Sequence, residues 1–139
     1  MKSAIENLQI ALRRGEAIRP KVGGFPYLAE CLRRAGAKRN RWSLPSCQSI
    51  FITDSGTVAI QGQPLVSGFV DVPPYCEPSL IAALRADQAG ETSFPEFLAA
   101  SWKAGVVAYD VDFVARKVSY FGAHGECYVE AYAEVTLPS

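Results

Sequence analysis

The chain has 139 residues, of which 49% are hydrophobic and 20% are charged, and its fourteen basic side chains balance fourteen acidic ones. This length and composition predict one globular domain with its own core, and they exclude a disordered chain of low hydrophobicity. No apolar run approaches the roughly 18 residues that a membrane-spanning helix needs, so we expect no membrane contact.

Two helices and several short strands are predicted in the first half of the chain. Leu8, Ala11 and Leu12 recur at helical spacing and predict a helix over 4–14 that ends at Gly15. After a loop, a second helix is expected over 25–35, before Gly36. The apolar period then becomes that of strands, which we expect at 41–44, 48–53, 57–61 and 65–72.

The second half repeats this order after the break at Pro73 and Pro74. Pro78 suits the first turn of a helix that ends near Gly90, and Ser93 with Glu96 predicts a capping box for the next helix. Strands are then expected at 107–113, 116–122 and 126–134.

Phe25–Gly36 and Phe94–Gly105 both begin with Phe-Pro and end with Ala-Gly, at an offset of 69 residues. We interpret this as an internal duplication of a helix–helix–β-meander unit. The alternative is two ordinary amphipathic helices with similar starts. The predicted fold is α+β, with a mostly antiparallel sheet and helices on one side. We expect one domain over 1–139, with units at about 4–64 and 77–135 and a connecting strand at 65–74.

The two halves differ in charge. Residues 1–69 carry a net charge of +6 and residues 70–139 a net charge of −6. Opposite fields of this size favour packing of the halves on each other or head-to-tail self-association, so we expect a homo-oligomer such as a dimer. The alternative is that the surface charge has simply drifted.

Three runs of residues resemble a known family: Arg19–Glu30, Trp42–Ile50, and Asp87–Glu91 followed by Phe94–Leu98. The family is small, bacterial and also carried on prophages, and its members are sometimes labelled "phage envelope protein". Its function is unknown. The resemblance therefore implies a family and no particular reaction, cofactor or catalytic residue.

Cys47 and His124 are weak candidates for catalysis. A nucleophilic cysteine needs a base or a positive neighbour, and His124 is the sole histidine. The alternative is a buried, inert Cys47 and a solvated His124 in a turn, and we favour it. Because the first residues lack a signal peptide, we expect a cytoplasmic protein with reduced thiols. The cysteine spacings predict no metal site, and we expect no cofactor.

Asp87 and Glu91 are candidates for ligand binding, together with Arg19 and Lys21 of the corresponding loop in the first unit. Asp87 continues the apolar face of its helix, where a carboxylate needs a partner. One hypothesis is a polar pocket for a cation or a basic ligand at the helix–helix junction. Another is an ion pair between the two loops.

Two further groups are candidates for surface recognition. The basic run that includes Arg39 and Arg41, followed by Trp42, could contact phosphates and stack on a base. The neutral chain and the lack of a nucleic-acid-binding motif argue against this use. Tyr128, Glu130 and Tyr132 share one face of the last strand and could bind a protein. The alternative is a solvated sheet face with amphipathic tyrosines. The opposite face, which includes Val129, is expected in the core.

The chain has none of the common nucleotide-binding, serine-hydrolase or zinc-protease motifs. Our first hypothesis is therefore a non-catalytic binding or interaction module that self-associates. The second is a small-ligand-binding protein or enzyme with a pocket near Cys47, Asp87 and Glu91. The third is nucleic-acid binding through residues 33–42.

Overall fold

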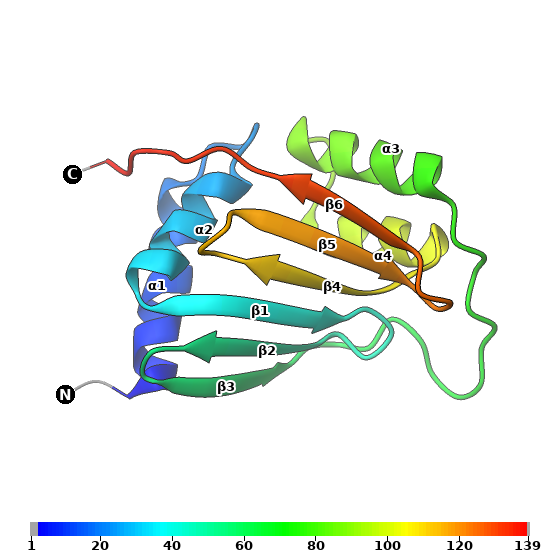
Figure 1. Ribbon diagram of the computed structural model, residues 1–139, viewed down its shortest axis with the longest axis horizontal. Coiled ribbons are helices and arrows are strands. Elements are labelled where there is room, and N and C mark those ends of the chain that lie inside the picture. The colour runs from blue at the N-terminus through cyan, green and yellow to red at the C-terminus, as the bar shows by residue number, and fades with distance from the viewer. Residues whose placement is uncertain (1–2, 139) are drawn as a thin grey trace.

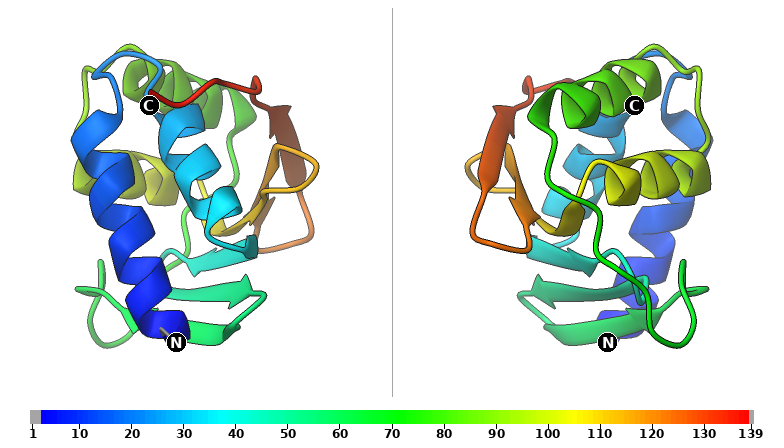
Figure 2. Two further views of the ribbon diagram at one scale, coloured as in Figure 1. Left: turned by 90° about the vertical axis from the view of Figure 1, so that its left-hand side faces the viewer. Right: turned by 90° about the vertical axis from the view of Figure 1, so that its right-hand side faces the viewer.

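The structure, a computed structural model, describes residues 3–138 and places two pairs of helices on one face of an antiparallel sheet (Figures 1 and 2). This is an α+β fold. In the described chain the helices are α1 (Ala4–Ile18), α2 (Phe25–Arg34), α3 (Glu77–Gln88) and α4 (Phe94–Lys103). The strands are β1 (Ala37–Ser43), β2 (Gln48–Thr53), β3 (Gly56–Gln61), β4 (Val106–Asp112), β5 (Lys117–Gly122) and β6 (Cys127–Ala131).

The helix–helix–strand pattern occurs twice in the order of the elements. The bounds of α2, β1 and β2 recur in α4, β4 and β5 at an offset of 69 residues. The sheet order is β3-β2-β1-β4-β5-β6, so the two units meet where β1 pairs with β4. Arg41 of β1 lies opposite Asp110 of β4, which is its own counterpart at that offset. The units are therefore related by an approximate two-fold axis through the centre of the sheet.

Backbone conformation repeats with the same offset. Gly36 and Gly105 end α2 and α4 with φ of 98° and 85°, in the region that favours glycine. Cys47 and Arg116 occupy equivalent tight turns before β2 and β5, with φ of 52° and 56°. The turn therefore requires a left-handed residue and not a particular side chain.

The helix starts follow local rules. The hydroxyl of Ser3 accepts a hydrogen bond from the backbone N–H of Glu6, which caps α1. Ser93 and Glu96 form the predicted capping box of α4. Proline lies in the first turn of α2, α3 and α4, where its missing N–H removes no helical hydrogen bond.

The first strand begins at Ala37 and not at 41, the last strand ends at Ala131 and not at 134, and two further predictions are wrong. The first helix continues through Gly15 to Ile18, because Gly15 lies against Leu28 and its lack of a side chain lets α1 approach α2 closely. The predicted connecting strand over 65–74 is an irregular segment instead. Pairing with the sheet is limited there to contacts near the β1–β2 turn, such as the hydrogen bond from Leu65 N–H to the Pro45 carbonyl.

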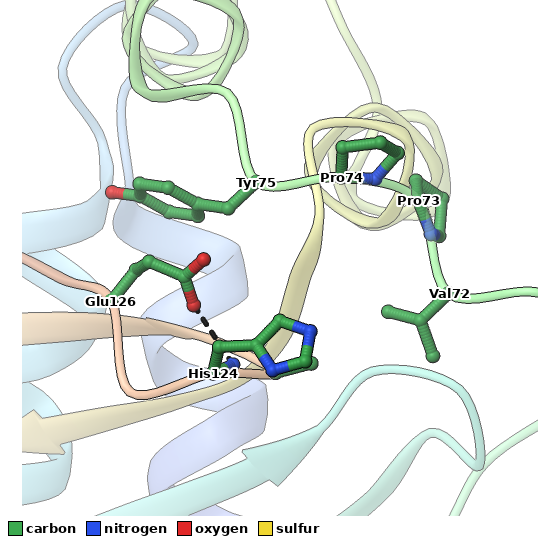
Figure 3. Close-up of a pocket in the computed structure, with 7 residues that line it drawn as sticks. Val72, Pro73, Pro74, Tyr75, His124 and Glu126 are labelled. Carbon is green, nitrogen blue, oxygen red and sulfur yellow. Dashed lines mark hydrogen bonds between the residues drawn. The ribbon is translucent and has the colours of Figure 1, made fainter.

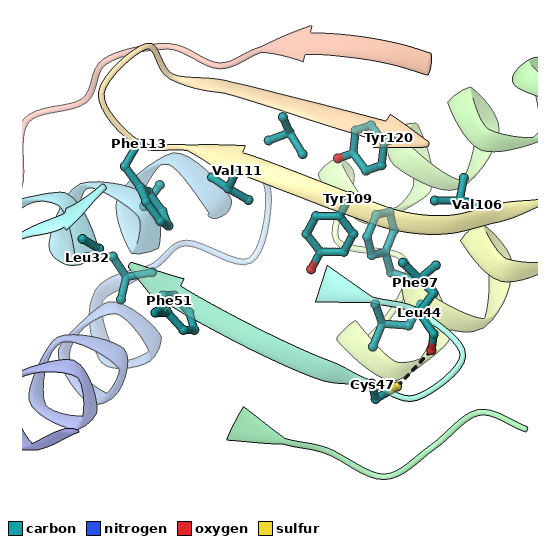
Figure 4. Close-up of a cluster of buried hydrophobic side chains, with 14 of the residues drawn as sticks. Leu32, Leu44, Cys47, Phe51, Phe97, Val106, Tyr109, Val111, Phe113 and Tyr120 are labelled. Atoms are coloured by element: carbon teal, nitrogen blue, oxygen red, sulfur yellow. Dashed lines mark hydrogen bonds between the residues drawn. The ribbon is translucent and has the colours of Figure 1, made fainter. Parts of the chain in front are cut away.

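The core lies between the helices and the sheet. Figure 4 shows part of it, including Phe51, Val111 and Phe113. Residues after β6 run back over the first helix pair, where Leu137 is buried and Arg14 donates a hydrogen bond to the carbonyl of Pro138. The C-terminal segment thus joins the second unit to the first.

Candidate ligand-binding cavity

A cavity of about 750 Å³ lies between the four helices and the sheet. Its volume falls within the range typical of small-molecule sites, about 300–1,000 Å³. Side chains of both units line it in counterpart pairs at the 69-residue offset: Phe25 and Phe94, Leu28 and Phe97, Asn40 and Tyr109, Trp42 and Val111, Phe51 and Tyr120. The cavity therefore lies on the approximate two-fold axis, where the two units join.

Four aromatic side chains on adjacent strands form a continuous row on the helix-facing side of the sheet. Trp42 of β1 stacks on Tyr109 of β4 with ring centroids 6.0 Å apart. Tyr109 lies 5.7 Å from Tyr120 of β5, which lies 6.4 Å from Tyr128 of β6. We call Trp42, Tyr109, Tyr120 and Tyr128 the aromatic row. Its first three members line the cavity, and Phe94 of α4 meets the edge of Trp42.

The tyrosines of this row bring polar atoms to a mostly apolar wall. Tyr109 and Tyr120 are only 7% and 6% exposed, and Figure 4 shows them projecting from the neighbouring strands β4 and β5. Burial raises the pKa of both hydroxyls. Within residues 3–138 neither hydroxyl has a hydrogen-bond partner, and neither is among the side-chain atoms that the protein fully encloses. Both hydroxyls therefore face the cavity and can bond to a molecule inside it.

Asp87 provides a carboxylate on the helix side of the cavity. Burial raises the pKa of Asp87, although the nearby Arg19 guanidinium acts in the opposite direction. No ion pair or side-chain hydrogen bond forms at this carboxylate among the described residues. Burial contributes most to raising the pKa of Tyr109 and Tyr120, and the charge of Asp87, which lines the same cavity, adds to it.

Glu130 lines the same cavity but is fully engaged. Its carboxylate accepts hydrogen bonds from Arg85 at 2.8 and 3.1 Å, from Gln88 at 2.7 Å and from the Tyr128 hydroxyl at 2.7 Å. Burial opposes ionisation, but these donors together lower the pKa of Glu130. This cluster ties β6 to the C-terminal end of α3 and holds the cavity wall in place.

The structure brings together three of the four residues proposed for ligand binding. Arg19, Lys21 and Asp87 line the cavity. Glu91 does not, because its side chain is exposed in the α3–α4 loop. Asn40, Tyr109 and Tyr120 also line the cavity and were missed, since strand periodicity marks buried positions without showing which ones border a cavity.

Cys47 and His124 do not form a pair. Cys47 is 4% exposed, its thiol donates a hydrogen bond to the Leu44 carbonyl, and burial raises its pKa (Figure 4). His124 lies in the β5–β6 turn, about three strand spacings or roughly 14 Å across the sheet from the β1–β2 turn. Cys47 does not line the cavity either. The predicted catalytic pair of Cys47 and His124 is therefore wrong, and so is the prediction that Cys47 lines a ligand pocket.

Trp42 does not share a surface with Arg39 and Arg41. The two arginines lie on the outer face of β1, whereas Trp42 points toward the helices and stacks on Tyr109. Arg41 pairs with Asp110 at 3.0 Å and lies over the ring of Phe121. A base could not stack on Trp42 while these arginines held its phosphates on the opposite face.

The last strand has its faces opposite to the predicted ones. Tyr128, Glu130 and Tyr132 point toward the helices, and Tyr132 packs edge-on against Phe25. Val129, expected in the core, is 50% exposed on the outer face. Because both sets alternate equally well, only the pairing of β6 with β5 decides which set faces inward. Glu130 and Tyr132 therefore line the cavity, and the stripe faces the helices instead of forming an open surface for a protein partner.

A smaller pocket of about 370 Å³ lies where the connecting segment meets the β5–β6 turn (Figure 3). Its lining includes Pro73, Pro74, Tyr75 and His124, and Glu126 accepts a hydrogen bond from the backbone N–H of His124. Two polar side chains here already have local partners, because Glu126 accepts this hydrogen bond and the Tyr75 hydroxyl donates to Glu77 at 3.2 Å. This pocket therefore offers less to a ligand than the central cavity.

Residues 3–138 contain neither a candidate metal cluster nor a candidate membrane span. No group of three or more histidine, cysteine, aspartate or glutamate side chains is arranged to hold a metal ion. None of the helices there combines the length and the apolar character that crossing a bilayer requires.

The chain is similar to mycobacterial proteins whose functions are not known. It is 53% identical over 135 residues to the uncharacterised proteins Mb2035 of Mycobacterium bovis and Rv2012 of Mycobacterium tuberculosis H37Rv. The alignment covers 97% of this chain and 82% of each relative. The chain belongs to the same family as these proteins. No family model matches it.

Proposed function

We propose that this protein is a non-catalytic binding module that holds a small organic molecule in the central cavity. The observation that carries the proposal is the cavity itself, which combines aromatic walls with the hydroxyls of two buried tyrosines, for which the described chain provides no hydrogen-bond partner. Buried polar groups in proteins are normally hydrogen-bonded. A bound molecule, or water in its absence, supplies the missing partners.

Self-association, the cellular location and the relation to the prophage-borne family remain predictions. The homo-oligomer was inferred from the charge of the two halves, but some of these charges pair within the chain, as in Arg41–Asp110 and Arg116–Glu30. An open sheet face that carries Ile50, Ile52 and Val129 now gives the better support for self-association. A cytoplasmic location and kinship with the prophage-borne family also remain proposals.

Native mass spectrometry of the freshly purified protein tests ligand binding and self-association together. We expect a retained small-molecule mass that is released on denaturation. A titration with the neutral fluorophore N-phenyl-1-naphthylamine provides a second measurement, since its emission rises in an apolar cavity. The absence of both a retained mass and fluorophore binding would refute the proposal.

A matched pair of variants assigns the binding to the cavity. Val111→Phe adds a ring at the cavity wall, whereas Ile52→Phe adds the same ring on the open face of the sheet. We expect Val111→Phe to weaken fluorophore binding at least about tenfold, equivalent to about 1.4 kcal/mol, and Ile52→Phe to bind like the wild type. Equal binding by both variants would place the fluorophore elsewhere.

A further inference from the structure

We infer that the ligand of this cavity is an arylalkylamine, with its flat ring against the aromatic row and its protonated amino group beside Asp87. This inference rests on the proposed ligand-binding function and deepens it by naming the chemistry of the ligand. Three features of the cavity carry it: the shape of its apolar wall, the state of its charged groups and the position of its free hydroxyls.

The apolar wall suits a planar ring. Trp42 and Tyr109 are nearly parallel, with 17° between their planes, and Tyr109 and Tyr120 differ by 40°. Phe94 closes one side with its ring at 70° to Trp42. Aromatic rings prefer offset stacking or edge-to-face contact with one another, so a flat aromatic guest suits this wall.

The charged groups favour a positive ligand. Glu16, Asp87 and Glu130 line the cavity with Arg19 and Lys21. Arg19 pairs with Glu16 at 3.4 Å, and Glu130 is bonded to Arg85, which leaves the half-buried Asp87 without an ion pair in the described chain. A half-buried carboxylate loses hydration and gains most from a cationic partner.

Lys21 is the cation that would bind an anionic ligand, and it is less well placed in the cavity than Asp87 is. Lys21 is exposed in the α1–α2 loop, where water already solvates its ammonium group. An anionic ligand that reached into the cavity would also bring its charge toward Asp87. The cavity therefore discriminates against a carboxylate on the same ring system.

The hydroxyls complete the site for an amine. An ammonium group donates up to three hydrogen bonds and accepts none. The Asp87 carboxylate and the hydroxyl oxygens of Tyr109 and Tyr120 are acceptors that border the same cavity. An ammonium group bound to Asp87 still has N–H donors for a tyrosine hydroxyl, with its ring along the row toward Trp42.

Three probes with the same ring system test the inference by isothermal titration calorimetry at pH 7: 1-naphthylmethylamine, 1-naphthalenemethanol and 1-naphthoate. We expect the amine to bind at least about tenfold more tightly than the neutral alcohol and the carboxylate to bind most weakly, as for a partly buried charge pair. An alcohol or carboxylate that bound as tightly as the amine would refute the arylalkylamine ligand while leaving a ligand-binding cavity. Failure of all three to bind would also refute it, and the retained mass and fluorophore measurements would still judge the cavity independently.

Asp87→Asn and Glu91→Gln form the matched pair of variants. Removing a half-buried charge relieves its desolvation, so Asp87→Asn is expected to fold. We expect it to bring the amine-to-alcohol affinity ratio to about one, mainly by weakening the binding of the amine. Glu91→Gln removes an exposed carboxylate outside the cavity and should keep the wild-type ratio. An unchanged ratio in Asp87→Asn would refute the role of this carboxylate.

Discussion

Replacement of Glu30 by glutamine should destabilise the fold in a pH-dependent way. Glu30 lies on α2 with 5% of its surface exposed. Its carboxylate accepts hydrogen bonds from Arg33 at 2.8 and 2.6 Å and from Arg34 at 3.1 Å. Arg116, in the β4–β5 turn of the other unit, lies 3.7 Å away. Glu30→Gln therefore leaves three cations near a neutral amide and weakens a link between the units.

The expected loss of unfolding free energy follows from the pKa of Glu30 in the folded protein. The hydrogen bonds from Arg33 contribute most to lowering the pKa of Glu30 from 4.5 to about 2. A shift of this size corresponds to about 3 kcal/mol at pH 7, and we expect about 2–3 because the arginines are partly exposed to solvent. Since the folded-state pKa lies below the unfolded one, this stability is present above pH 4.5 and is lost as the pH falls toward 2. At pH 3 about 1 kcal/mol should remain.

Urea unfolding of the wild type and Glu30→Gln at pH 7, 4 and 3 measures the difference in unfolding free energy directly. Glu16→Gln is the control, because Glu16 also pairs with an arginine three residues away but is 64% exposed. Exposed pairs contribute about 0–1 kcal/mol, so the control should change little at any of these pH values. The loss of unfolding free energy in Glu30→Gln should shrink from pH 7 to pH 3 and should exceed that in Glu16→Gln. If either expectation failed, the stability could not be assigned to a buried ionised carboxylate at Glu30.

Two further predictions concern thiols and glycines. Iodoacetamide at pH 7.5, followed by peptide mapping, should label Cys76 at least about 100-fold faster than Cys47, because Cys76 is exposed with a pKa lowered by Ser79 whereas burial raises the pKa of Cys47; equal rates would contradict this. Gly105→Ala should cost about 2–4 kcal/mol in urea unfolding, because a Cβ there would lie 2.5 Å from the Tyr75 Cα. Gly125 has a similar φ, but a Cβ added there would meet no other atom within 4 Å, so Gly125→Ala should cost only about 1 kcal/mol. A similar loss of stability in both variants would contradict the steric explanation.

Local rules were enough to predict most of the helices and strands. The capping box at Ser93 and the proline positions are consequences of unpaired N–H groups at a helix start, which depend on neighbouring residues alone. The 69-residue offset, visible in the two Phe-Pro segments, correctly predicted a second set of elements with the same order. Gly15 was misassigned because a glycine can end a helix or admit a neighbouring helix, and only the contact with Leu28 distinguishes these roles.

The candidate site depended on tertiary structure. Asp87 stood out in the sequence because it continues an apolar face, but its neighbours Tyr109 and Tyr120 come from strands of the same unit that lie beyond the next helix. Trp42 joins them only because β1 pairs with β4 across the junction of the units. Pairing of strands that are far apart in the chain is set by the packing of the whole sheet, which local patterns do not encode.

The amino-acid sequence by itself therefore determined the repeated helix–helix–meander order and the ends of most elements, since these arise from interactions over a few residues. Tertiary structure alone decided that Tyr128 and Glu130 face inward and that the two units enclose a cavity on their approximate two-fold axis. The physical reason is that an alternating strand can present either face to the core. The choice is made only when its partner strand and the helices above it are in place.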